Sequence, residues 1–154
     1  MLEENVAALT LGDDLRQIEL FGNDFTVREY PAGAVRLADQ IAEYFAGDRK
    51  SFEFTPIWDD VRFDKIFHFT DWQKKVWSET MDIPYGATLN YGELARRCGK
   101  RDGARAVGNA LGKNPIPILV PCHRVVSKSG PGGFSTPVGL RQKKALILHE
   151  LLNR

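Results

Sequence analysis

The chain has 154 residues, enough for one compact domain or for two small lobes that share a core. It is 43% hydrophobic and 27% charged with a net charge of +1, which is ordinary for a globular protein. No apolar run approaches the roughly 18 residues of a membrane span, and the acidic residues 1–14 lack a signal-peptide pattern, so we expect a cytoplasmic protein outside the membrane. Two cysteines and three histidines without zinc-binding spacing predict free thiols, no metal site and no cofactor.

Residues 1–65 predict a small N-terminal α/β lobe. Leu15–Leu20 and Phe25–Arg28 have strand character, and the Gly-Asn-Asp sequence between them is typical of a turn. Ser51–Thr55 alternates phenylalanine with polar residues, as a half-buried strand does. Nothing in this lobe indicates chemistry, and we interpret it as a scaffold.

A helix over residues 34–46 is predicted inside this lobe. Its apolar residues recur at helical spacing and would form one face that packs on a sheet. This face consists of Val35, Ala38, Ile41, Ala42 and Phe45. Gly47 follows as a helix stop.

Residues 66–154 predict a helical C-terminal domain, so the whole chain is expected to be of the α/β (α+β) class. Thr70 can cap a first helix, which ends before Pro84. One face of that helix carries Trp72, Val76, Trp77 and Thr80. We interpret the two tryptophans as core rather than as a platform on which bases stack.

A helix-turn-helix is predicted next. Asn90 and Glu93 form a capping-box pattern for a short helix, Tyr91–Cys98. A second helix covers residues 103–111 after a tight turn that contains glycine. Its small side chains would let it approach a DNA groove closely, with Arg105 projecting, although small residues serve helix packing equally well.

The charged residues are distributed unevenly along the chain. Residues 1–95 contain nine Lys and Arg against eighteen Asp and Glu, a net of −9, whereas residues 96–154 contain twelve against two, a net of +10. A solvated basic face would explain this excess as well as a polyanionic partner would. A difference of this size nevertheless favours nucleic acid.

An apolar run, Ile118–Val120, predicts a short buried strand or extended segment that leads to the Pro-Cys-His-Arg sequence at residues 121–124. A glycine-rich loop follows at residues 130–135. The last helix is predicted from Gly139 to Leu152. Its buried side is expected to contain Leu140, Ile147, Leu148 and Leu151.

Cys122 and His123 are a candidate nucleophile and base. A thiol becomes a useful nucleophile at neutral pH when a base or a positive charge stabilises its thiolate, and His123 and Arg124 are of the right type. Adjacent side chains rarely point at each other, however, so the pair taken alone favours a buried structural cysteine. Cys98, on the inner side of a short helix, is also interpreted as structural.

The segment IPILVPCHRVV at residues 116–126 resembles the active-site segment of the O6-alkylguanine-DNA alkyltransferase family. The resemblance covers roughly residues 69–152 and includes YGELAR, RAVGNALGKNP, GGFS and a final His-Glu pair in the family's order. It implies direct DNA repair, an irreversible single-turnover transfer of an alkyl group to Cys122 from O6 of guanine or O4 of thymine. The implied partner is double-stranded DNA that contains O6-alkylguanine, bound through its minor groove by a monomer.

The resemblance also implies catalytic roles. Cys122 matches the alkyl acceptor, and His123 matches the histidine that deprotonates it through a water molecule. Glu150 matches the carboxylate that orients this histidine, as in a catalytic triad. Asn114 matches the asparagine that braces the active-site turn.

The implied DNA contacts follow from base flipping, because the reacting carbon cannot be reached in a stacked duplex. Arg105 matches the arginine that fills the gap in the base stack, and Tyr91 the tyrosine that helps rotate the 3′ phosphate. The DNA-binding set is completed by Arg124, Ala104 and Gly108. The substrate pocket is expected to contain Phe134, Ser135, Pro117 and Val125.

The chain departs from the family pattern at three places. Phe134 stands where the family often has tyrosine, and Thr136–Val138 makes the following loop longer than the common form. The zinc-binding residues that some relatives carry in the N-terminal lobe are missing. The first two departures bear on the transfer rate and on the width of the substrate pocket.

Three other functions compete with this interpretation. A non-catalytic protein that binds alkylated DNA would carry another residue, usually tryptophan, in place of Cys122. A Cys-His hydrolase leaves the helix-turn-helix and the basic half unexplained. A helix-turn-helix regulator accounts for both but leaves Cys122, His123 and Glu150 without a role.

Overall fold

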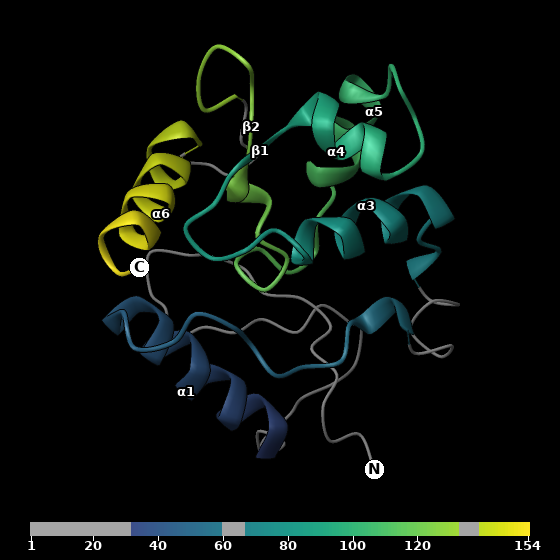
Figure 1. The fold of residues 1–154 in the computed structure, drawn as a ribbon. Coiled ribbons are helices and arrows are strands. Elements are labelled where there is room, and N and C mark those ends of the chain that lie inside the picture. The colour runs from purple at the N-terminus through teal and green to yellow at the C-terminus, as the bar shows by residue number, and fades with distance from the viewer. Residues whose placement is uncertain (1–31, 60–66, 133–138) are drawn as a thin grey trace. The chain divides into compact units, whose positions relative to one another are not determined.

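The computed structural model describes residues 32–59, 67–132 and 139–154 (Figure 1). The chain divides into two compact units, Met1–Phe69 with Pro115–Pro117 and Thr70–Asn114 with Ile118–Arg154. The predicted strands within residues 15–28 lie outside the described residues, and the domain boundary after residue 65 stays a prediction. Within the described ranges, no helix has the length and apolar character needed to cross a membrane.

The described part of the first unit contains helix α1, Ala32–Ala46, and a 3-10 turn, η1, Ile57–Asp59. Gly47 ends α1 with a φ of 88°, which confirms the predicted stop. The expected apolar face was wrong in part, because Ala42 and Phe45 are exposed. The buried stripe instead contains Leu37, Gln40, Ile41 and Tyr44. This stripe also has helical spacing and buries larger side chains than one that contains two alanines.

The predicted strand at residues 51–55 does not form a regular ladder, since only Thr55 makes a β-bridge. The predicted alternation is present, with Phe52 and Phe54 half-buried between exposed neighbours. Gln40 binds the backbone of this segment instead: its side-chain amide donates to the carbonyl of Glu53 at 3.3 Å and accepts from the Glu53 amide at 2.7 Å. A side chain from α1 thus satisfies backbone groups that a neighbouring strand would otherwise bind.

The second unit contains helices α3, Asp71–Met81, α4, Tyr91–Arg97, α5, Ala104–Leu111, and α6, Leu140–Leu152. Two short strands, β1 at Leu89–Asn90 and β2 at Val125–Val126, pair in parallel with Leu89 opposite Val125. A 3-10 turn, η2, at Cys122–Arg124 leads directly into β2. The mixed fold is of the predicted α/β class.

Local sequence signals place the first helices of this unit. Thr70 and Gln73 form a capping box at the start of α3, and Asn90 and Glu93 form the predicted one at the start of α4. Helix α5 begins after Gly103, so α4 and α5 form a helix-turn-helix that matches the predicted one to within one residue at each end.

Two tryptophans of α3 attach it to α5, and of the two predicted core residues Trp77 is buried whereas Trp72 is half-buried. Nε1 of Trp77, which is fully buried, donates to the carbonyl of Ala110 at 2.9 Å. Nε1 of Trp72 donates to the carbonyl of Ala106 at 3.2 Å. Both bonds end on backbone carbonyls of α5, so α3 serves as the support on which the second helix of the helix-turn-helix rests.

Two predictions in the C-terminal half were wrong. Ile118 and Leu119 form a turn rather than a strand, and Ile118 has a φ of 76°, a backbone conformation that a β-branched residue rarely adopts. Helix α6 buries Lys143, Leu146 and Glu150, whereas the expected inner residues Leu140, Leu148 and Leu151 are exposed. Hydrophobicity failed as a guide to α6 because two charged side chains occupy its inner face.

Candidate active site

Cys122 is the first residue of η2 and is buried, with 7% of its surface exposed. Its backbone amide donates to the carbonyl of Val120 at 2.8 Å, which closes a tight turn just before the thiol. The β1–β2 pairing fixes the chain immediately after η2. The thiol is therefore placed between a tight turn and a short strand.

Asn114 braces this turn in the manner that the resemblance implied. Its Nδ2 donates to the carbonyl of Val120 at 2.9 Å and to Sγ of Cys122 at 3.3 Å. A single amide group thus joins the backbone before the cysteine to the cysteine sulfur itself. A donor aimed at sulfur favours the thiolate over the thiol.

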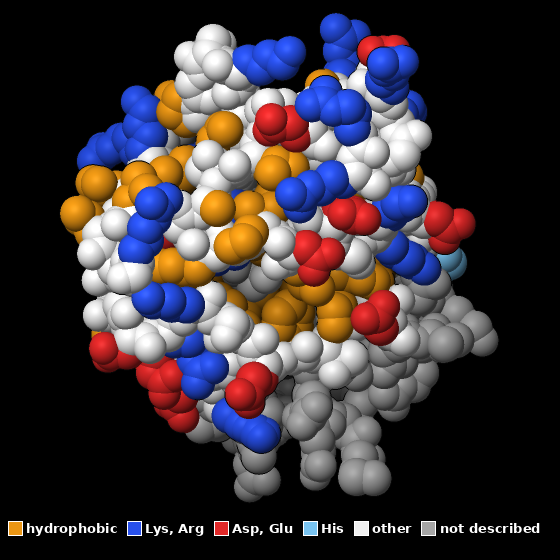
Figure 2. All heavy atoms as spheres, in the orientation of Figure 1, with side chains coloured by type: hydrophobic (Ala, Val, Ile, Leu, Met, Phe, Trp, Pro, Cys, Tyr) orange, Lys and Arg blue, Asp and Glu red, His pale blue; other side chains and the backbone are white. Residues whose placement is uncertain are grey.

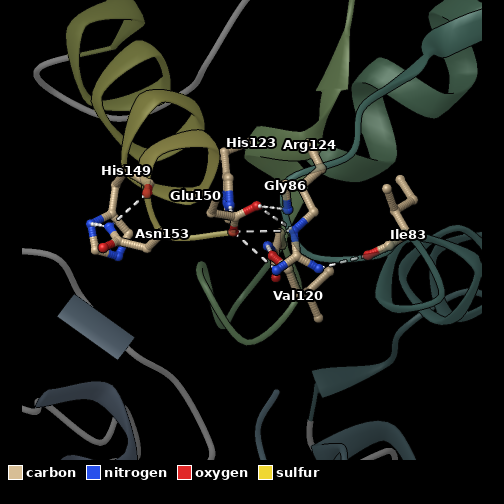
Figure 3. A network of polar contacts seen from close by, with 9 residues as sticks. Ile83, Gly86, Val120, His123, Arg124, His149, Glu150 and Asn153 are labelled. Carbon is tan, nitrogen blue, oxygen red and sulfur yellow. Dashed lines mark hydrogen bonds and ion pairs between the residues drawn. The ribbon is translucent and has the colours of Figure 1, made fainter. Parts of the chain in front are cut away.

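His123 lies beside Cys122 in sequence but is directed toward α6 (Figure 3). Its Nε2 is 2.7 Å from Oε1 of Glu150, and both side chains are 1% exposed. Since the carboxylate accepts, Nε2 carries the proton and Nδ1 carries the lone pair. Nδ1 is buried and has no hydrogen-bond partner among the described residues, so it is free to accept a proton.

Glu150 is the centre of the polar network (Figure 3). Besides His123, it accepts from Nε of Arg124 at 3.0 and 3.2 Å, from Nη2 of Arg124 at 2.9 Å, and from the amide of Gly86 at 2.9 Å. His149, the adjacent residue on α6, points away from the network, and its Nδ1 lies 3.4 Å from Nδ2 of Asn153. Only one member of the His-Glu pair therefore takes part in the site.

The electrostatics of the network favour an ionised carboxylate, a neutral histidine and a protonated thiol at rest. Burial raises the pKa of Glu150, but the hydrogen bonds from His123 and Arg124 outweigh it and lower that pKa to about 2. Burial lowers the pKa of His123, against the opposing effect of Glu150. Burial also raises the pKa of the Cys122 thiol, which the Asn114 hydrogen bond and then Lys143 partly offset. The thiol thus needs a nearby base, and neutral His123 can be that base.

Arg124 was expected to contact DNA, but its position does not fit that role. The side chain is buried and binds Glu150, and its Nη1 donates to the carbonyl of Ile83 at 2.6 Å. Its guanidinium also lies 5.7 Å from the centre of the Tyr85 ring. Arg124 therefore belongs to the interior of the site, as the positive partner of Glu150.

The other expected DNA contacts lie on α4 and α5. Ala104 and Arg105 are exposed at the start of α5, whereas Gly108 is half-buried and faces the ring of Tyr91. On the face drawn in Figure 2, Lys and Arg are the commoner charged side chains toward the top, where Figure 1 places α4 and α5. Tyr91 is half-buried. Burial raises the pKa of its hydroxyl, and a negative charge on Cys122 raises it further.

Only two of the four expected pocket residues lie within the described part of the chain. Val125 is fully buried in β2, and its carbonyl accepts from Nζ of Lys143. Pro117 is half-buried and belongs to the first compact unit. Phe134 and Ser135 lie outside the described residues, as does the loop at residues 136–138.

Two residues of the site were missed by sequence reasoning. Gly86 has a φ of 70° and donates its amide to Glu150, and Lys143 is completely buried on α6. The glycine sits in a Pro-Tyr-Gly turn and could have been flagged for its conformation. The lysine carried no signal, because a lone lysine in a helical pattern is ordinarily exposed.

Known proteins are similar to this chain in sequence and in fold. The sequence model of a family described as "6-O-methylguanine DNA methyltransferase, DNA binding domain" matches residues 71–152. A methylated-DNA–protein-cysteine methyltransferase of Mycobacterium tuberculosis is 44% identical over 117 residues, 75% of this chain, and the chain spans 62% of that relative's length. A probable methyltransferase of the same name from Acanthamoeba polyphaga mimivirus is 45% identical over 111 residues, 72% of this chain and 68% of the relative.

Solved structures show the same similarity. The crystal structure of the Mycobacterium tuberculosis O6-methylguanine methyltransferase matches with a TM-score of 0.69 and 39% identity, and the match covers 81% of this chain and 70% of that one. A structure of the Mycobacterium tuberculosis protein in complex with DNA matches with a TM-score of 0.69 and 40% identity, over 80% of this chain and 71% of that one.

Proposed function

This chain belongs to the O6-methylguanine DNA methyltransferase family, and we propose from that premise that it repairs DNA by moving an alkyl group from O6 of guanine onto Cys122. The observation that carries the proposal is the buried series Cys122, His123 and Glu150. It combines a thiol fixed by Asn114 with a neutral histidine whose Nε2 is held 2.7 Å from an ionised carboxylate. The relatives' names and the DNA complex support the same reaction.

The proposed chemistry is a single displacement. Nδ1 of His123 takes the thiol proton through a water molecule, and the sulfur of Cys122 attacks the alkyl carbon. The S–C bond forms as the C–O bond breaks, and the electron pair stays on the guanine, which takes up the proton that the thiol lost. A thioether is a stable product that ordinary side chains do not dealkylate, so each molecule acts once.

Glu150 keeps His123 in the tautomer that this step needs. Its carboxylate accepts the Nε2 proton, which leaves the lone pair on Nδ1. Arg124 and Gly86 hold the carboxylate in place from its other side. The network therefore fixes both the direction and the protonation state of the base.

The proposed partner is duplex DNA, bound through its minor groove by a single copy of the chain. Helix α5 supports this, because Ala104 leaves its exposed N-terminal end narrow and Arg105 beside it is the long side chain that can enter the base stack. Such a helix would contact the DNA backbone and fit the shape of the groove without reading the bases. This mode of binding suits a protein that searches for a lesion rather than for a sequence.

Incubation with duplex DNA that carries O6-methylguanine with a labelled methyl group tests this proposal. We expect one label per protein molecule and a repaired guanine in the DNA. Cys122→Ser should bind the same duplex and acquire no label. Binding of the alkylated duplex by the native chain without transfer of the label would show a recognition protein instead.

A further inference from the structure

Lys143 is a fully buried lysine that the proposed mechanism does not use. It lies in the middle of α6 with 0% of its surface exposed, while Leu148 and Leu152 of the same helix are 55% and 75% exposed. Burying an ammonium group costs free energy, whereas burying leucine gains it. A lysine on the inner face, with leucines of the same helix exposed, therefore lowers the stability of the fold. This cost points to a role for Lys143 in the site.

The contacts of the ammonium group place it against the active-site segment. Nζ donates to the carbonyl of Val125, three residues after Cys122, and to the hydroxyl of Tyr91 at 3.4 Å. It also lies 5.5 Å from the centre of the Tyr91 ring. These partners come from β2 and α4, so Lys143 is held where the two elements meet beside η2.

Helix α6 presents one cation and one anion to the site. Lys143 and Glu150 are seven residues apart, about two helical turns, and so lie on the same face. Glu150 contacts His123, while the charge of Lys143 interacts with Cys122. Helix α6 therefore supplies a carboxylate that binds the base, His123, and an ammonium group whose charge acts on the nucleophile, Cys122.

We propose that Lys143 is a positioning residue whose buried positive charge stabilises the Cys122 thiolate during alkyl transfer. The inference deepens the proposed function and rests on it. A fixed cation beside a buried thiol lowers the free energy needed to form the thiolate. The low dielectric of the interior strengthens the attraction between the two charges. The charge also disfavours protonation of His123, so that the histidine remains able to accept the thiol proton.

Burial and the neighbouring groups set the protonation state of Lys143. Burial lowers the pKa of Lys143 to about 8, and the Cys122 charge opposes that effect, so the ammonium form persists at neutral pH and is favoured further once the thiolate forms. Tyr91 faces it from α4 through its hydroxyl and its ring, and the charge of Lys143 acts on Cys122 and His123 of η2. Among the described residues, Arg124 is paired with Glu150, whereas the charge of Lys143 partly offsets the rise that burial causes in the pKa of the Cys122 thiol.

The test compares Lys143→Met with the native chain and with Lys144→Met, an exposed lysine on the same helix, all in a Cys98→Ala background. The thiolate of Cys122 is titrated by its ultraviolet absorbance, and benzyl transfer from free O6-benzylguanine is followed against pH. We expect Lys143→Met to lower the thiolate fraction and the transfer rate at neutral pH by about tenfold or more, because removing an adjacent opposite charge shifts a pKa by at least one. Lys144→Met should match the native chain in both.

Thermal unfolding separates this role from a structural one. Methionine fills the same space without a charge, so we expect Lys143→Met to melt no lower than the native chain while its thiol becomes harder to ionise. Lys143→Arg, which keeps the charge, should recover part of the thiolate fraction. An unchanged thiol titration in a folded Lys143→Met protein would overturn the inference. If the native chain itself transferred no benzyl group, the proposed function would fail, and the titration would still decide the role of Lys143.

Discussion

Arg124 contacts Glu150 through two of its nitrogen atoms, with Nε 3.0 Å from Oε2 and Nη2 2.9 Å from Oε1. The carboxylate that orients His123 is therefore shared with a buried guanidinium. This sharing limits how strongly Glu150 can attract a proton to the histidine. His123 is thus held in the correct orientation and kept neutral at the same time.

The first prediction concerns acid stability. Because the pKa of Glu150 falls from its ordinary 4.5 to about 2 in the folded chain, its contribution to stability is complete above pH 4.5 and is lost as the pH falls toward 2. Glu150→Gln should be less stable than the native chain by about 3 kcal/mol at neutral pH, since it leaves Arg124 buried without its charge partner. Urea unfolding should show this difference shrinking below pH 4.5. A difference that stays constant down to the lowest pH would contradict the assigned ionisation.

The second prediction concerns the pH dependence of transfer. Burial lowers the pKa of His123 and the charge of Arg124 adds to that effect, so Arg124→Met should raise this pKa and leave more of the histidine protonated at a given pH. The acidic limb of the transfer rate with free O6-benzylguanine should then move to higher pH. Arg124→Lys keeps the charge and should lie closer to the native profile. A folded Arg124→Met protein with the native profile would show that Arg124 only supports the fold.

The third prediction concerns Gly132, which is packed against Tyr91. Its φ is +75°, and a Cβ at this position would lie 2.9 Å from Cε2 of Tyr91 and 3.2 Å from the amide of Ser127. Gly132→Ala should therefore displace Tyr91 and slow transfer, with a stability loss of about 2 kcal/mol or more from backbone strain and the clash together.

Two other glycines separate these causes. Gly99 has a φ of +81° and open space around its Cβ position, so Gly99→Ala should show the strain alone, about 1 kcal/mol. Gly130 has open space and no positive φ, and Gly130→Ala should be close to neutral. Melting temperatures and transfer rates of the three variants give the comparison. Equal effects at Gly132 and Gly99 would mean that the contact with Tyr91 has no consequence.

The fourth prediction concerns Arg105, which is exposed on α5. If it fills the gap that a flipped base leaves, its loss should penalise only the extrahelical state. Arg105→Ala should slow transfer from duplex DNA about tenfold or more and leave the reaction with free O6-benzylguanine near the native rate. Lys128→Ala, another exposed basic residue, should weaken DNA binding only mildly. Loss of the free-base reaction in Arg105→Ala would place the residue in the fold or the pocket instead.

The sequence predicted the elements that local signals determine. The cap at Thr70, the capping box at Asn90 and the glycine after α1 involve residues within four positions of one another, and these elements were placed correctly. The inner face of α6 could not be predicted in this way. Lys143 and Glu150 are buried against polar partners from α4, β2, η2 and the turn at Gly86, and hydrophobicity alone favours the leucines.

The same distinction holds within the site. The resemblance implied catalytic roles for Cys122, His123, Asn114 and Glu150. The structure contains the contacts of Asn114 with Cys122 and of His123 with Glu150, and the roles stay a prediction. Arg124 was assigned to DNA binding because it lies in a basic segment. Its partner Glu150 is 26 residues away in the sequence, so no local pattern indicated that the arginine is buried. The turn at Ile118 was also missed, because its positive φ runs against the preference of isoleucine.

The identity of the alkyl acceptor is the central claim, and peptide mapping after reaction with O6-benzylguanine tests it most directly. The chain contains two buried free cysteines, of which only Cys122 has Asn114, His123 and Lys143 around it. We predict one benzyl group per molecule, located on Cys122, with Cys98→Ala reacting like the native chain. A benzyl group on Cys98, or full labelling of Cys122→Ser, would contradict the account.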